Sequence, residues 1–133
     1  MLFRSDLTGI SPSPAEQQQF LANIAAHGLT AAKAEAADRM LQSPHSAERL
    51  AMHWLDGARY ADTNGYNNDE MRTMWPWRDW VINAFQSGMP WDQFLIEQLA
   101  GDLLPDATIS QKVATGFIRN HVLTTEGGII EDE

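Results

Sequence analysis

Apolar residues recur along most of the chain with the three- and four-residue spacing of a helix, and each periodic stretch has clear end signals. Residues 14–27 carry one such stripe, which begins after a capping residue at Ser13 and stops at Gly28. An alanine-rich stretch over 30–41 and a third stripe over 44–58 follow, the latter opened by a Ser-Pro pair. These patterns predict three helices in the first half of the chain.

The second half continues in the same way after an interruption. Residues 62–76 lack a period and are rich in Asn, Asp, Thr and Gly, which is typical of a polar loop. Helical stripes return over 76–87, 90–100 and 108–117, whereas 121–133 has no helical period and is acidic. No alternating strand pattern of useful length is present. The sequence therefore predicts an all-α orthogonal bundle of five to six short helices, with residues 1–133 forming a single helical domain.

The apolar stripes also predict which side chains form the core. All five tryptophans lie between residues 54 and 91, and all but Trp75 lie on helical stripes, so we expect four of them to be buried. Trp75 lies in the loop before a helix, so its burial is less expected. The predicted core centres on Leu50, Trp54, Leu55, Trp80, Val81, Phe94, Leu95 and Leu99.

Composition narrows the range of functions. The chain has 133 residues, a length that suits one domain. It contains no cysteine, which excludes disulfides, thiolate metal sites, cysteine nucleophiles and covalent haem within this stretch. Its formal charge of −9 argues against nucleic acid and anionic membrane surfaces as partners. No apolar run approaches the roughly 20 residues of a membrane span, so membrane insertion is not expected.

Candidate chemistry is sparse, and no catalytic residue and no metal ligand set are predicted. The four histidines form no HExxH motif, and His53 lies at the flank of its apolar stripe. His53 is interpreted as a boundary residue, with an axial ligand to a haem or metal supplied by another segment as the alternative. The carboxylates of Asp79, Glu97 and Asp102 have no spacing that selects an acid–base pair.

The polar loop is the one segment whose composition favours a binding site. It is not an EF-hand, because Gly65 stands at the fourth position instead of the sixth, although a looser calcium site stays open beside a metal-free capped loop. Loops held by rigid helices often carry binding residues. We expect the candidate binding residues to be His53 and the loop group, which would line one concave surface: Arg59, Tyr60, Asp62, Asn64 and Tyr66. The alternative is that Arg59 and Asp62 simply tie the loop to the preceding helix.

A series of short segments, in order along nearly the whole chain, resembles a known family. The segments include LTGISPSP (7–14), HWLD (53–56), ARYAD (58–62), NGY (64–66), WRDWV (77–81), MPWDQF (89–94), EQLAGDLLP (97–105), ATGF (114–117) and RN (119–120). Together they resemble the planctomycete cytochrome-c-associated domain of unknown function, the PSCyt-two family. The chain departs from that pattern at Ile118, where the family often has histidine.

This resemblance implies a function that the residues alone do not indicate. It implies a non-catalytic helical module of an exported periplasmic or cell-surface protein, whose partners are the other domains of the same protein. It also implies that this chain is a fragment without cofactor, and that the full-length protein carries haem c on a downstream Cys-x-x-Cys-His motif. The alternative function is a carbohydrate-binding or hydrolase-like domain that uses the loop aromatics and carboxylates.

Overall fold

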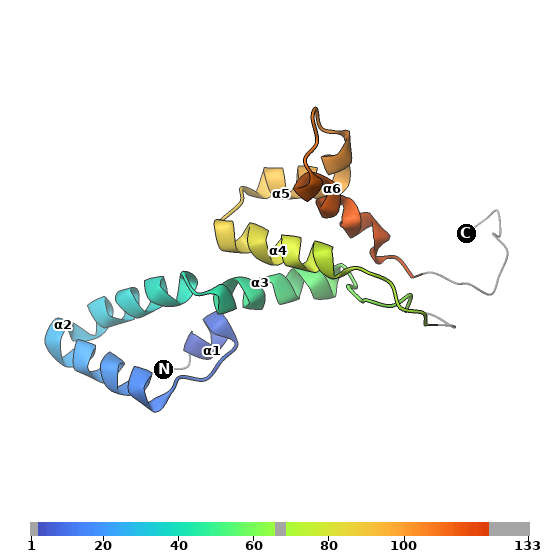
Figure 1. Cartoon of the computed structure of the whole chain (residues 1–133). Coiled ribbons are helices and arrows are strands. Elements are labelled where there is room, and N and C mark those ends of the chain that lie inside the picture. The colour runs from blue at the N-terminus through green and yellow to red at the C-terminus, as the bar shows by residue number, and fades with distance from the viewer. Residues whose placement is uncertain (1–2, 66–68, 123–133) are drawn as a thin grey trace, which may run out of the picture.

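The computed structural model describes residues 3–65 and 69–122, and these residues form an all-α bundle (Figure 1). In chain order the elements are α1 (Phe3–Thr8), α2 (Pro14–Leu41), α3 (Pro44–Gly57), α4 (Trp75–Ser87), α5 (Trp91–Ala100), the 3-10 helix η1 (Gly101–Leu103), α6 (Ile109–Ala114) and the 3-10 helix η2 (Thr115–Asn120). Apart from one isolated bridge between Thr63 and Met71, the described segments contain no β-pairing. The predicted fold class is confirmed.

Capping boxes explain where α2 and α6 begin. The Ser13 hydroxyl accepts from the Glu16 backbone N–H at 3.3 Å, and the Glu16 carboxylate accepts from the Ser13 N–H at 2.8 Å. Thr108 opens α6 with the same reciprocal arrangement. The predicted stop at Gly28 is a sharp kink inside α2, with φ 80° and ψ 163°, which divides that element into two helical arms.

The helix α1 was not predicted, because its sequence carries no clear helical stripe. Tertiary contacts hold it instead. The Arg4 guanidinium donates to the Glu16 carboxylate at 3.0 Å and to the Ile10 carbonyl at 2.6 Å, and the Phe3 ring meets the Phe20 ring edge-on. In Figure 1, α1 lies beside the two arms of α2 at one end of the molecule. This end is joined to the rest through α3, which contacts α1, α2 and α4.

The main core lies at the other end, between α3, α4, α5 and α6. Its buried members include four residues from the apolar stripes: Trp77, Trp80, Val81 and Phe94. Trp54, Leu55 and Leu95 pack against them and are partly buried. Two predicted core residues are wrong, because Leu50 and Leu99 lie on the solvent side of their helices. Trp91 is also 55% exposed, although one face of its ring stacks on Phe94. Helical period alone located the stripes, but the width of the covered face is decided by the neighbouring helices.

Candidate functional site

The polar loop joins α3 to α4 through one carboxylate. Asp62 accepts a hydrogen bond from the Tyr60 hydroxyl with one oxygen, and with the other it accepts from the Met74 backbone N–H at 2.9 Å. Its own carbonyl accepts from the Arg72 N–H, also at 2.9 Å. Because Met74 has no capping side chain, Asp62 caps the first turn of α4 from twelve residues earlier in the sequence.

Both partners in this pair have shifted pKa values. Burial and the hydrogen bond to Asp62 raise the pKa of Tyr60 to about 12. Burial also acts to raise the pKa of Asp62, but the hydrogen bonds from Tyr60 and from the first backbone amides of α4 outweigh it, so the net shift is downward. At neutral pH the phenol therefore stays protonated and the carboxylate stays ionised. Neither group titrates near pH 7, where a general acid or base works best.

The other sequence-predicted site residues are dispersed around this pair. Arg59 is exposed and has a left-handed backbone conformation, with φ 57°. Asn64 is buried, and its backbone N–H donates to the Glu70 carbonyl at 2.9 Å across the loop. His53 is exposed on α3, and Tyr66 lies outside the described residues. The structure thus brings Tyr60 and Asp62 together, while the shared concave surface remains a prediction.

Two of the acidic candidates, Glu97 and Asp79, have partners within the fold. Glu97 is buried, and its carboxylate accepts from the Gln93 amide at 2.9 Å and from the Gln111 amide at 3.4 Å. Asp79 pairs with the adjacent Arg78 at 2.8 Å. Over residues 3–65 and 69–122, no group of three or more His, Asp or Glu side chains could hold a metal ion. In the same residues, no helix combines the length and the apolar character that crossing a membrane requires.

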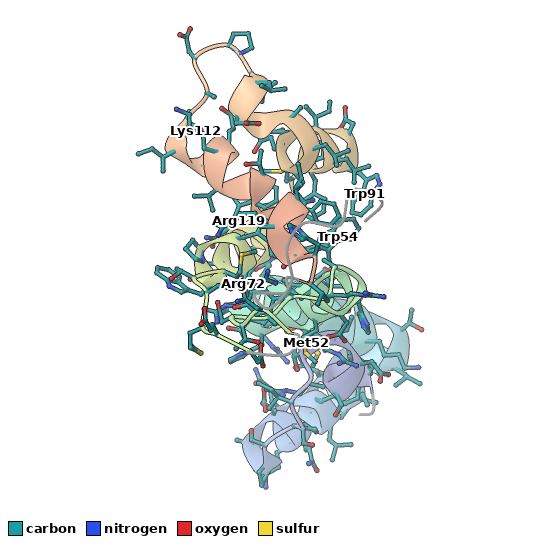
Figure 2. All side chains as sticks on the ribbon, turned by 90° about the vertical axis from the view of Figure 1, so that its right-hand side faces the viewer. Met52, Trp54, Arg72, Trp91, Lys112 and Arg119 are labelled. Atoms are coloured by element: carbon teal, nitrogen blue, oxygen red, sulfur yellow. The ribbon has the colours of Figure 1, made fainter. Side chains whose placement is uncertain are left out.

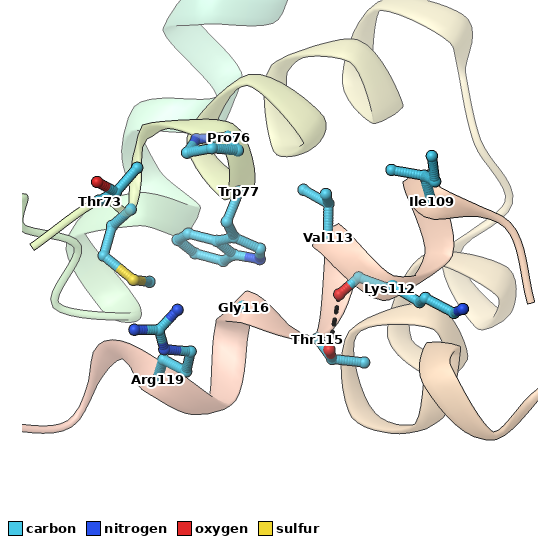
Figure 3. A pocket seen from close by; sticks show the side chains of 10 residues that line it. Thr73, Pro76, Trp77, Ile109, Lys112, Val113, Thr115, Gly116 and Arg119 are labelled. Atoms are coloured by element: carbon cyan, nitrogen blue, oxygen red, sulfur yellow. Dashed lines mark hydrogen bonds between the residues drawn. The ribbon is translucent and has the colours of Figure 1, made fainter.

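A cavity of about 340 Å³ that the sequence did not predict lies between the start of α4 and the α6–η2 segment (Figure 3). Apolar side chains form much of its lining, with Met74 and Trp77 almost fully buried at its floor. Gly116 lies against the Trp77 ring so closely that a Cβ there would come within 2.9 Å of the Trp77 Cβ. In the sequence, the feature that could have indicated this cavity is the pair of cations Lys112 and Arg119 on either side of Gly116.

One buried polar atom at this cavity is left without a partner. The Trp77 indole N–H is inaccessible to solvent and makes no hydrogen bond within the part of the chain that the structure describes. A buried donor without an acceptor costs about 1–3 kcal/mol. In Figure 3 the ring nitrogen is on the side of the indole that faces Val113 and Lys112. The cavity therefore combines a largely apolar lining with two cations, and the unsatisfied indole N–H lies buried beside it.

The fold and these contacts define an all-α domain in which no catalytic arrangement is recognisable among the described residues. The chain matches a family model over residues 3–133, nearly its full length, and so belongs to that family. The family is described as PSCyt2, protein of unknown function (DUF1549). No curated protein and no solved structure is similar enough to the chain to count as a match.

Proposed function

We propose that this chain is a non-catalytic helical module of an extracytoplasmic, planctomycete-type protein associated with cytochrome c. In this proposal, one face of α5 packs against another domain of the same protein, which holds the haem. The proposal joins the family membership to one observation, the distribution of residues on α5.

The helix α5 buries two polar side chains beside Phe94 and leaves an apolar stripe exposed. Glu97 and Gln98 are 5% and 1% exposed, and each is hydrogen-bonded to neighbouring side chains. On the same helix and the turn after it, Ile96, Leu99 and Leu103 are more than half exposed. A solvent-facing helix normally shows the reverse pattern. An exposed apolar stripe beside a satisfied polar interior favours a second packing surface on this helix.

The polar groups that the fold gathers support a module without catalytic activity. The hydrogen bonds of the Tyr60–Asp62 pair have a structural role, because Asp62 accepts from Tyr60 and from the Met74 N–H at the start of α4. The carbohydrate-binding or hydrolase-like alternative has no supporting observation. Since the chain contains no cysteine, a haem c associated with it would be held by another part of the protein.

The proposal is tested first on the gene. The coding sequence that follows the Glu133 codon should continue in frame and encode a Cys-x-x-Cys-His motif. A stop codon at that place, or a continuation without such a motif, would overturn the association with haem c.

The packing of α5 is tested with a single introduced thiol, because the chain has no cysteine of its own. Leu99→Cys should react readily with a thiol reagent in this chain alone, where position 99 is 58% exposed. In the longer protein encoded by the gene, the same thiol should react at least about ten-fold more slowly, because the other domain covers it. Peptide mass mapping of the labelled protein separates position 99 from the cysteines of the downstream haem motif.

A matched control uses Gln19→Cys on α2, a position that is exposed and distant from α5. Its thiol should react at the same rate in both proteins. Equal reactivity of the Leu99→Cys thiol in the short and long proteins would refute the packing role of α5. Slower reaction at both positions would point to general shielding and would also count against a specific α5 interface.

A further inference from the structure

The cavity beside α4 has a chemistry that the proposed packing function does not use. Its floor is apolar and rigid, because Trp77 and Met74 are each 2% exposed and Gly116 lies directly against the indole. A volume of about 340 Å³ is at the lower end of the range for small-molecule sites, so the ligand that fits is small.

The charge of the cavity is opposite to that of the protein. The chain carries −9 overall, yet the lining contains Lys112 and Arg119 and no carboxylate. Neither cation forms an ion pair with an acid in the ranges that the structure covers. Figure 2 shows both on one side of the molecule with Arg72, away from Trp54 and Trp91 on the other. A cationic rim in an acidic protein attracts small anions selectively.

The unused polar groups of the lining are mainly hydrogen-bond donors. The Arg119 guanidinium and the Lys112 ammonium can only donate, and both side chains are exposed where they line the cavity. The Thr115 hydroxyl already donates to the Lys112 carbonyl at 2.8 Å, the bond drawn in Figure 3. A complementary ligand therefore presents acceptors without donors, and a carboxylate is the common group of this kind.

We propose that this cavity binds a small carboxylate that carries an apolar group, such as an aromatic or branched-chain acid. The carboxylate pairs with Arg119 at the rim, and the apolar group packs against the partly exposed side chains of Pro76 and Val113, which lie beside the buried Trp77. In Figure 3 the Arg119 guanidinium lies on the same side of the indole as Thr73, whereas Lys112 extends on the side of Ile109. Arg119 is thus the anchoring cation, and Lys112 contributes charge from the opposite rim.

The test is a two-dimensional NMR titration of the intact chain with benzoate, and with benzamide as the uncharged ligand of nearly the same shape. Benzoate should shift the amide signals of Val113 and Gly116 saturably, with a dissociation constant in the millimolar range expected for so small a ligand. Benzamide should bind roughly five-fold more weakly or worse, because it cannot pair with a cation. Inorganic phosphate tests the contribution of charge alone and should produce smaller shifts at the same amides.

Variants assign the binding to the cavity. Arg119→Gln should weaken benzoate binding roughly five-fold and leave benzamide unchanged, and Lys112→Gln should have a smaller effect in the same direction. Lys33→Gln, which removes an exposed cation from α2, is the matched control and should change neither. The spectra themselves report whether each variant is folded.

Three results would overturn the proposal. They are the absence of saturable shifts with benzoate, equal affinity for benzoate and benzamide, and phosphate binding as tight as that of benzoate, which would indicate a charge site without an apolar component. An equal loss in Lys33→Gln and Arg119→Gln would mean that only net charge matters, and it would likewise refute a specific site.

Discussion

The hydrogen bond between Trp54 and Gln98 joins α3 to α5 in the core, and its removal should be costly in an asymmetric way. The Trp54 indole N–H donates to the Gln98 side-chain oxygen at 2.9 Å, and Gln98 is 1% exposed. Trp54→Phe keeps an aromatic ring next to Phe94 but leaves the buried amide oxygen without its donor. We expect a loss of about 1–3 kcal/mol in the free energy of unfolding from this unsatisfied acceptor alone.

Removing the acceptor instead of the donor should reduce the free energy of unfolding by less. Gln98→Met keeps the length of the side chain and removes the acceptor, but the Trp54 N–H that it strands belongs to a partly buried residue. Water therefore compensates part of the loss. In the double variant both partners are apolar, so its destabilisation should be smaller than the sum of the two single losses by about 1 kcal/mol.

Urea unfolding followed by far-ultraviolet circular dichroism measures these values, with unchanged m-values as the sign that each variant unfolds like the parent chain. Trp54→Phe combined with Gln86→Met, an exposed position on α4, is the control pair and should be additive. If Trp54→Phe and Gln98→Met were also additive within about 0.3–0.5 kcal/mol, the hydrogen bond would contribute nothing to stability and the reasoning would be refuted.

Further predictions concern capping and close packing. Hydrogen bonds with the Ser13 backbone and hydroxyl lower the pKa of Glu16 to about 2, so its contribution to stability is present above pH 4.5 and is lost as the pH falls toward 2. Glu16→Gln should therefore flatten the fall of the melting temperature over that range, and an unchanged acid profile would contradict the assignment. Gly101→Ala should destabilise the chain by about 1–3 kcal/mol, because its Cβ would lie 2.2 Å from the Gln111 carbonyl oxygen. Gly57→Ala, with open space around its Cβ, should instead stabilise by about 0.4–1 kcal/mol, and equal effects of the two alanines in urea unfolding would refute the clash.

The sequence by itself determined the class of fold and most helix boundaries. The Ser13 and Thr108 capping boxes each act over three residues, and Gly88 ends α4 in the left-handed conformation that glycine adopts easily. These signals are local, so they operate before distant parts of the chain meet. The short helix α1 escaped prediction because it depends on Arg4 and its contact with Glu16, twelve residues away.

Only the tertiary structure decided which faces of the helices are covered. Leu99 and Gln98 are neighbours on α5, yet the polar one is buried because Trp54, forty-four residues earlier, provides its hydrogen-bond donor. In the same way, Asp62 became a helix cap because the loop returns it to the first turn of α4. The cavity also depends on segments that are distant in sequence, since α4 forms one wall and the cation at position 119 belongs to the other. Side-chain spacing specifies a helix, but burial and charge at a site depend on what the rest of the chain places beside it.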